Sequence, residues 1–438
     1  MINSQKIASQ IIGPVLTFFL FFMLLSGPRL KLPDLNITFS ILLAGLCILF
    51  LVFKRKINKS IFRILIILII SLSLSLFSLI YNNVDSFSTI EYFLKMILWF
   101  FASYFIVALY NICYKDKVYE KLSFHIQYIY FINATFVICV MFIPQIKNLA
   151  TTYLSNNENM TWLINKSIRS TDLVMGGGAL TSIVFSVIFI MALCSLIYTR
   201  KKIFLCFIIV YTAAIIFTGR TGLILIILFI APILIMINYS KNKRIFSFKI
   251  ILTSLGFFII IPILMYLIFL FFQLMLPNVM DEIEKSSLTW SLELVRNLLS
   301  SGKFETESTT DLANMYSHVS PLDVFSFFGS GLDGRDRDVF YLNTDVGYIR
   351  ALFSFGFFGM IFIFAKYIYI FINSVSHFIT CENNYFKFTI IISLSYYSLS
   401  ILIVNFKEFH EAVRSGFPLL MTLFISLNYN KKYKSEGL

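Results

Sequence analysis

The sequence predicts an all-α, polytopic integral membrane protein, and three observations carry that prediction. Hydrophobic residues make up 58% of the 438 residues and charged residues only 13%, whereas about 25% of the residues in an average soluble domain are charged. The mean hydropathy is +0.83. The apolar residues also gather in runs close to the length of about 17–25 residues that an α-helix needs to cross a bilayer.

The apolar runs give about twelve candidate transmembrane helices. They are 11–26, 37–53, 61–80, 93–112, 124–143, 179–198, 203–218, 222–239, 250–276, 346–372, 386–404 and 412–428. The first run resembles a signal peptide but lacks a clear small-residue cleavage site, so we expect an uncleaved span. As a single helix, residues 203–239 would extend about 55 Å, which is too long for a hydrocarbon core of about 30 Å. We therefore expect two short spans hinged at Gly219-Arg220-Thr221-Gly222.

The basic residues predict the orientation of these spans. One set of alternate loops, together with the C-terminal tail, contains Lys54, Arg55, Lys56, Lys59, Arg63, Lys115, Lys117, Lys121, Arg200, Lys201, Lys202, Lys241, Lys243, Arg244, Lys249, Lys431, Lys432 and Lys434. Basic loops face the cytoplasm, so we expect both termini inside and Arg220 at the outer border. The net charge of +13 is explained by these loops and does not indicate a nucleic-acid partner.

The spans divide the chain into three parts. Residues 1–276 hold the first nine predicted spans, with an outward loop at 144–178. Residues 277–345 form a large outward loop, in which the apolar spacing of 286–301 predicts an amphipathic helix on the membrane surface; a solvated linker helix is the alternative. Residues 346–438 hold the last three spans and a cytoplasmic tail. The six cysteines predict no disulfide framework, because they lie in apolar runs or cytoplasmic loops.

Two arginines stand out at predicted outward helix ends. Arg220 lies between Gly219 and Gly222, where a guanidinium can bind a diphosphate through two parallel hydrogen bonds; the alternative is that it reaches towards lipid phosphates. Arg169 precedes three glycines that open the sixth span, and such turns into helix N-termini bind anions. From this stretch alone, a flexible turn is the favoured interpretation of the glycines.

The stretch 327–359 contains the candidate catalytic carboxylate. Asp345 stands at the start of the tenth span and is followed by Tyr348 and Arg350. It is either a helix N-cap or a general base beside arginines that stabilise an anionic leaving group. Further basic residues on the predicted outward side are Lys95, Arg335, Arg337, Lys407 and Arg414. No His, Asp or Glu pair has the spacing of a metal site.

These features resemble bacterial O-antigen and capsular polysaccharide polymerases of the Wzy type, which are relatives of the O-antigen ligases. The similarity of layout covers most of the chain: about twelve spans, with a large outward loop between the ninth and the tenth. "TGRTGL" resembles the family's small-Arg-small turn. "GSGL", an insert and "TDVGYIRALFSFGFFG" resemble its G-x-G, polar insert, H/D-x-x-x-Y and G-x-x-G pattern. "NFKE" resembles its Lys-Glu pair before the final span.

Two frames compete for the place that a histidine and a glycine occupy in the ligases. Asp345 has Gly356 after ten intervening residues, and His318 has Gly329 at the same spacing. We prefer the Asp345 frame, because it alone places the glycines inside a span. An aspartate in place of the ligase histidine favours the polymerase over the ligase.

The resemblance implies a GT-C-like, metal-independent glycosyltransferase without a cofactor. It would join undecaprenyl-diphosphate-linked repeat units into O-antigen or capsular polysaccharide at the outer face of the cytoplasmic membrane, in lipopolysaccharide or capsule biosynthesis. Its expected partners are lipid-linked donor and acceptor glycans, the bilayer and a chain-length regulator protein. An O-antigen ligase is the close alternative. A flippase or secondary transporter is the alternative of another class, and we expect it to carry charges deep within its spans.

The resemblance also implies roles for individual residues. Arg220 and Arg169 would bind the diphosphate, and Asp345 would be the base or orient the acceptor. Arg296, with Arg335 or Arg337, would help to bind the diphosphate, and Tyr348 and Trp290 would pack against sugar faces. Independently of the resemblance, Lys95 and Lys407 add positive charge to the same outward surface.

Overall fold

The computed structural model of the protein describes most of the chain outside the large outward loop. The described residues are 2–31, 33–54, 57–154, 158–166, 168–174, 178–242, 307–318, 326–333, 345–381, 384–409 and 414–429, together with Gly256, Leu270, Leu274 and Asn297. The predicted span 250–276, apart from three of these isolated positions, and the predicted amphipathic helix 286–301, apart from Asn297, lie outside them.

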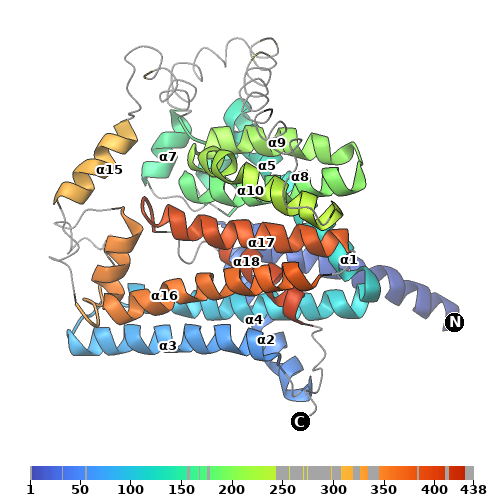
Figure 1. The fold of residues 1–438 in the computed structure, drawn as a ribbon, viewed down its shortest axis with the longest axis horizontal. Helices are drawn as coiled ribbons and strands as arrows, with labels where there is room; N and C mark the ends of the chain where they lie inside the picture. Colours follow the sequence, from blue (N-terminus) through green and yellow to red (C-terminus); the bar gives the residue numbers. More distant parts are fainter. Residues whose placement is uncertain are drawn as a thin grey trace.

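All the regular secondary-structure elements among the described residues are helices (Figure 1). The helices are α1 (Ile2–Ser26), α2 (Leu35–Lys54), α3 (Lys59–Tyr81), α4 (Ser88–Tyr114), the short η1 (Lys115–Lys117), α5 (Val118–Phe142), α6 (Pro144–Tyr153), α7 (Glu158–Asn165), α8 (Ala179–Thr199), α9 (Ile203–Thr218), α10 (Thr221–Asn242), α15 (Glu307–His318), α16 (Gly347–Thr380), α17 (Tyr385–Val404) and α18 (Gly416–Asn428).

The structure confirms an all-helical, multi-pass membrane architecture. Within the described residues, seven helical stretches are long and apolar enough to cross a membrane, and three shorter apolar helices accompany them. Each predicted span other than 250–276 coincides with a helix. The predicted break near Arg220 is also confirmed, because α9 ends at Thr218 and α10 begins at Thr221.

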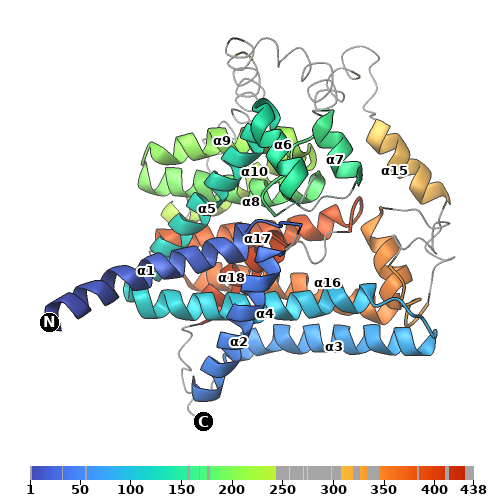
Figure 2. The ribbon, with the colours of Figure 1, turned by 180° about the vertical axis from the view of Figure 1, so that it is seen from behind.

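The helices differ in how much of their surface the bundle covers. α8 lies at the centre, and 83% of the residues in its most apolar, membrane-length stretch are buried inside the bundle. For α2 the buried share is only 28%. Figures 1 and 2 show α3, α4 and α16 running side by side, with α17 next to α16. A helix that is apolar on every side packs inside a bundle. The exposed apolar side chains of α2 and α3, such as Leu49 and Phe62, suit contact with lipid.

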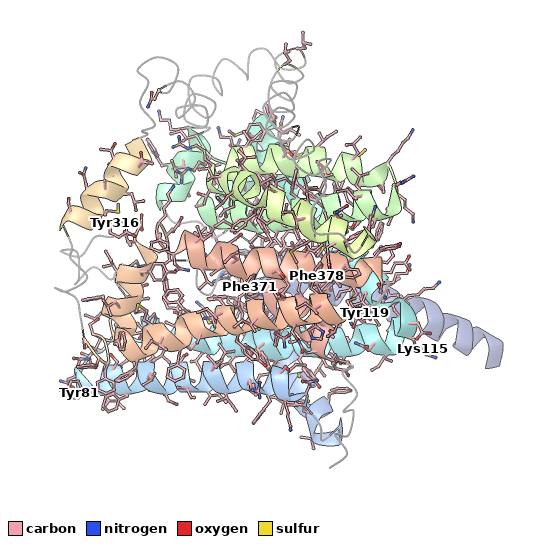
Figure 3. All side chains as sticks on the ribbon, in the orientation of Figure 1. Tyr81, Lys115, Tyr119, Tyr316, Phe371 and Phe378 are labelled. Atoms are coloured by element: carbon pink, nitrogen blue, oxygen red, sulfur yellow. The ribbon has the colours of Figure 1, made fainter. Side chains whose placement is uncertain are left out.

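The turns at one end of the bundle contact one another across long sequence distances. We call this the Arg220 end. The backbone N–H of Arg29, after α1, donates to the carbonyl of Leu173 at 3.0 Å, and that of Ser170 donates to Phe217 at 2.8 Å. The basic turn Lys115–Lys117 links α4 to α5, and the basic turn Arg200–Lys202 links α8 to α9. Both turns lie at the opposite end of the bundle. In Figure 3, Tyr81 and Tyr316 accordingly lie at one end and Lys115 and Tyr119 at the other.

The helix α16 departs from the predicted continuous span. Its backbone breaks at Gly356, where φ is +68°, and Figure 1 shows the bend. The segment 326–333 occupies this break: the N–H of Ser330 donates to Phe353 O at 2.7 Å, and that of Phe357 to Ser326 O at 2.8 Å. Gly329, with φ of +77°, lies directly against Gly356. The glycines of the two competing sequence frames therefore meet each other.

Candidate active site

Arg169 and Arg220 are placed by two helix starts that touch. A Cβ atom added to Gly219, beside Arg220, would lie only 3.0 Å from the carbonyl carbon and oxygen of Gly178, the residue before α8. The Arg169 guanidinium lies against the same Gly178, with Nη1 3.0 Å from a Cβ built there. The starts of α8 and α10 thus bring the two arginines to one place. Helix starts carry free N–H groups and a partial positive charge, both of which favour anions.

Lys407 and Glu408 approach from the loop after α17. Both backbone N–H groups donate to the carbonyl of Val404 at 2.8 Å, which continues the helix as a tight turn. The carbonyl of Asn405, two residues before Lys407, accepts a hydrogen bond from the N–H of Tyr348 at 3.0 Å. The start of α16, and with it Asp345, therefore lies beside this turn.

The charges of these segments lie within electrostatic range of one another. Burial lowers the pKa of Arg169; Glu408 opposes this effect, and Arg220 lowers the pKa further. Burial likewise lowers the pKa of Lys407, with Glu408 and Asp345 acting against it and Arg220 and Arg169 adding to it. We call Arg169, Arg220 and Lys407 the cation cluster. Four separate parts of the chain build this site.

The arrangement has the groups that diphosphate chemistry needs. Two guanidinium groups and an ammonium group can neutralise phosphate oxygens and a departing diphosphate. The two carboxylates, Glu408 and Asp345, can accept a proton from a sugar hydroxyl. With all five groups ionised, three positive and two negative charges leave a net charge of +1.

The structure places the other predicted site residues in different settings. Asp345 is exposed and precedes Val346, which holds the N-cap position of α16 without a side-chain bond. The Tyr348 hydroxyl donates to Leu402 O at 2.7 Å, and its ring packs against Phe364 and Phe406. Four predicted residues lie outside the described residues: Trp290, Arg296, Arg335 and Arg337.

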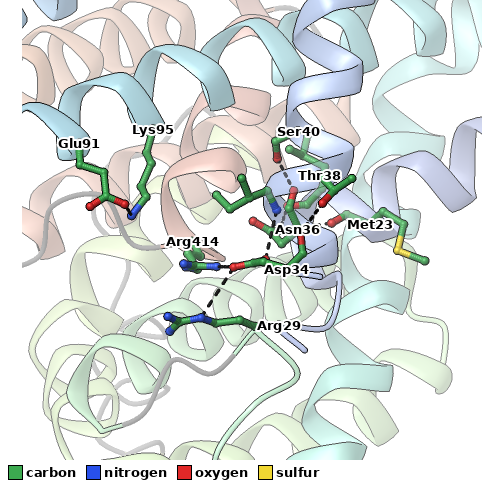
Figure 4. A network of polar contacts seen from close by, with 11 residues as sticks. Met23, Arg29, Asp34, Asn36, Thr38, Ser40, Glu91, Lys95 and Arg414 are labelled. Atoms are coloured by element: carbon green, nitrogen blue, oxygen red, sulfur yellow. Dashed lines mark hydrogen bonds and ion pairs between the residues drawn. The ribbon is translucent and has the colours of Figure 1, made fainter. Parts of the chain in front are cut away.

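Lys95 belongs to a second group of charges at the Arg220 end (Figure 4). It pairs with Glu91 on α4. Nearby, Asp34 accepts a hydrogen bond from Arg414 and has an oxygen 3.7 Å from Arg29 Nε. Burial lowers the pKa of Arg29, followed in effect by Arg414. This group ties the end of the α17–α18 loop to the α1–α2 turn.

Sequence reasoning left Glu408, Arg350 and Asp333 out of its predicted site. The "NFKE" motif contains Glu408 and could have indicated this residue as part of the site. No sequence signal joins Arg350 to Asp333, because their contact depends on how 326–333 docks against α16. Where the chain is described, no group of three or more His, Cys, Asp or Glu side chains could hold a metal ion.

The chain matches no protein-family model and no curated protein. The features that bear on its function are therefore those of its own structure. That structure is a multi-pass helical bundle in which a cation cluster and two carboxylates meet at one end.

Proposed function

We propose that this protein is a metal-independent glycosyltransferase that polymerises undecaprenyl-diphosphate-linked repeat units into O-antigen or capsular polysaccharide. The convergence of Arg169, Arg220 and Lys407 with Glu408 and Asp345 is the observation that supports it most. This combination suits a reaction with an anionic leaving group and a hydroxyl nucleophile.

In the proposed reaction, the growing chain moves from its lipid diphosphate to the terminal sugar of a new unit. The acceptor hydroxyl loses its proton to a carboxylate, for which Asp345 is our candidate, and its oxygen bonds to the anomeric carbon of the donor. The bond from that carbon to the diphosphate oxygen breaks, and the diphosphate leaves with the electron pair. The cation cluster stabilises the charge that develops on the leaving oxygen.

The proposed location is the outer face of the bacterial cytoplasmic membrane, with both termini in the cytoplasm. The basic turns Lys115–Lys117 and Arg200–Lys202 lie at the end of the bundle opposite the cation cluster. Because basic turns remain in the cytoplasm, the cluster faces outward, where lipid-linked repeat units present their diphosphates near the surface of the bilayer.

A transporter or flippase is the alternative of another class, and Lys366 is the residue that bears on it. This lysine lies inside α16 with 1% of its surface exposed, and buried charges within spans often mark transport paths. Its Nζ lies 3.6 Å from Met96 Sδ and 4.7 Å from the centre of the Tyr367 ring. This packed, aromatic setting favours a structural cation–π contact.

Deletion of the gene followed by a surface-glycan gel tests the proposal. Loss of a polymerase leaves single repeat units attached to the acceptor, because transfer to the acceptor continues. Loss of a ligase or a flippase leaves no glycan on the acceptor. A deletion strain that still shows a full ladder would refute all three functions.

A further inference from the structure

A buried ion pair lies next to the proposed site without belonging to the cation cluster. Arg350, in the first turns of α16, has 3% of its surface exposed, and its Nη2 lies 2.5 Å from Asp333 Oδ1. Asp333 ends the segment 326–333 that docks in the break of α16. The pair therefore fixes the last described residue before 334–344 to the helix that follows them.

The second oxygen of Asp333 is bound by α4. The Tyr92 hydroxyl donates to Asp333 Oδ2 at 2.8 Å. One turn earlier, Thr89 Oγ1 donates to the carbonyl of Gly331 at 3.0 Å. Asp333 thus joins α4, α16 and the segment from the outward loop.

The same arginine holds the loop that carries Lys407 and Glu408. Arg350 Cζ lies 5.1 Å from the centre of the Phe409 ring. The Tyr92 ring meets Phe409 edge-on at 6.1 Å, and the Phe355 ring stacks on it at 6.1 Å. Phe409 follows Glu408 directly, so a ring enclosed on several sides limits where the turn 407–408 can lie.

Stability alone does not account for a buried pair of this kind. Desolvation offsets much of the attraction between buried charges, and apolar replacements of both partners are often neutral or stabilising. Arg350 Nε is buried without a hydrogen-bond partner among the described residues, which adds a further cost. What the pair does provide is a fixed geometry, because Asp333 is held by α4 and α16 together.

We propose that Arg350 is a positioning residue: together with Asp333 and Tyr92 it clamps Phe409 and so sets the place of Lys407 and Glu408 beside Arg169 and Arg220. Arg350 acts through Phe409 and does not contact the diphosphate. The expected effect on anion binding rests on the proposed function. The effect of the clamp on the position of residues 405–409 does not, so it can be measured separately.

The first measurement is amide hydrogen exchange of residues 405–409 in the purified, full-length protein. The test variant, Arg350→Met with Asp333→Leu, replaces the pair by apolar side chains of similar size. We expect its thermal unfolding to stay near that of the wild type, while exchange at 405–409 becomes about tenfold faster because the turn opens locally more often. Unchanged exchange in a folded double variant would overturn the proposal.

Tyr92→Phe is the second variant, because it removes only the hydroxyl that binds Asp333. It tests the clamp even if the double variant does not fold. Tyr110→Phe is its matched control on the same helix. The Tyr110 hydroxyl bonds to His125 Nδ1 at 2.7 Å, near the opposite end of α4. We expect faster exchange at 405–409 in the Tyr92 variant only. Equal exchange in the two tyrosine variants would contradict the clamp.

The second measurement is the affinity for inorganic pyrophosphate, used as a probe for the diphosphate. Misplacing Lys407 should weaken binding about tenfold in the double variant, whereas a purely structural pair would leave the affinity unchanged. If the wild-type protein binds no pyrophosphate, the proposed diphosphate site fails, and the exchange data alone decide the clamp. Wild-type affinity in the folded double variant would show that the clamp does not act on the cation cluster.

Discussion

At the scale of single residues, the cation cluster keeps three like charges close together. Arg169 and Lys407 both have lowered pKa values, first because of burial. Glu408 moderates the repulsion, and Asp345 also acts on Lys407. A bound diphosphate would replace this repulsion by attraction, which is a physical reason for such a cluster to bind an anion.

Replacement of Arg220 tests the cluster most directly. We expect Arg220→Ala to abolish polymer without loss of protein, and Arg220→Lys to restore little, because an ammonium group cannot make the two parallel hydrogen bonds of a guanidinium. A surface-glycan ladder and a membrane immunoblot measure the two effects. Arg63→Ala is the control, because Arg63 is an exposed arginine near the start of α3, at the end of the bundle away from Arg220. Full-length polymer from the Arg220→Ala strain would exclude the diphosphate role.

The two carboxylates can be separated by paired substitutions. We expect Asp345→Asn to cripple polymerisation while the pyrophosphate affinity of the purified protein is kept, because the amide cannot accept the proton and the cations remain. Glu408→Gln is the comparison. Normal polymer from Asp345→Asn, together with loss of polymer from Glu408→Gln, would transfer the role of base to Glu408.

The lowered pKa of Lys407 predicts a pH dependence. With a pKa below 10.5, Lys407 loses its proton at a lower pH than an ordinary lysine, so pyrophosphate affinity should fall as the pH rises through that lowered pKa. Lys407→Arg should remove this fall, because an arginine stays charged throughout. Pyrophosphate titrations between about pH 7 and 10 measure it. The charged groups that act on Lys407 are Arg169, Arg220, Glu408 and Asp345. An unchanged pH profile in the Lys407→Arg variant would rule Lys407 out.

At the scale of elements, the site depends on the contact between Gly329 and Gly356. Both residues have positive φ values, and a methyl group on Gly329 would collide with the backbone of Phe355 and Gly356. Asn82 Nδ2 and Ser78 Oγ also donate to the carbonyl of Gly329, at 2.9 and 3.0 Å. Segment 326–333 is therefore seated by α3 as well as by α16.

We expect Gly329→Ala and Gly356→Ala each to destabilise the protein by about 2–4 kcal/mol, because a strained backbone and an overpacked contact add together. Gly45→Ala is the matched control. It lies in α2, where an added Cβ would have nothing within 4 Å, and alanine is the better helix former. Thermal unfolding of the purified variants measures the difference. Equal unfolding temperatures for all three would show that the two glycines do not need to touch.

At the scale of the whole molecule, the two ends of the bundle differ in charge and in architecture. One end carries the basic turns that link α4 to α5 and α8 to α9. At the other end, the turns bond to one another and assemble the cation cluster. This asymmetry suits a protein that keeps one end in the cytoplasm and works at the other.

Labelling of single cysteines in intact cells tests this orientation. In a background without native cysteines, we expect a membrane-impermeant maleimide to label Asp85→Cys, in the turn between α3 and α4. Lys201→Cys, in the turn between α8 and α9, should stay unlabelled until the cells are permeabilised. Both positions are exposed, so access depends only on the side of the membrane. The reverse pattern would place the cation cluster in the cytoplasm.

The sequence by itself determined the apolar helices among the described residues and the break between α9 and α10, but not the short helices α6, α7 and α15 or the break of α16 at Gly356. Runs of apolar residues set the length and type of each element, because a bilayer requires helices of a limited length with internally bonded backbones. Gly219 and Gly222 marked the turn, and the alternation of basic residues separated the two ends. These properties are local, and short windows of sequence are enough to read them.

The sequence, with the family resemblance, named Arg169, Arg220, Lys407 and Asp345 as site residues, but only the tertiary structure decided how these charges meet. Arg169, Arg220 and Lys407 lie on separate turns, and no spacing in the sequence reveals that Gly219 touches Gly178 or that the start of α16 bonds to Asn405. The clamp of Arg350, Asp333 and Phe409 and the contact between Gly329 and Gly356 are of the same kind. Such contacts depend on how distant segments pack, because side-chain pairing across helices follows from the geometry of the bundle and not from the order of residues along the chain.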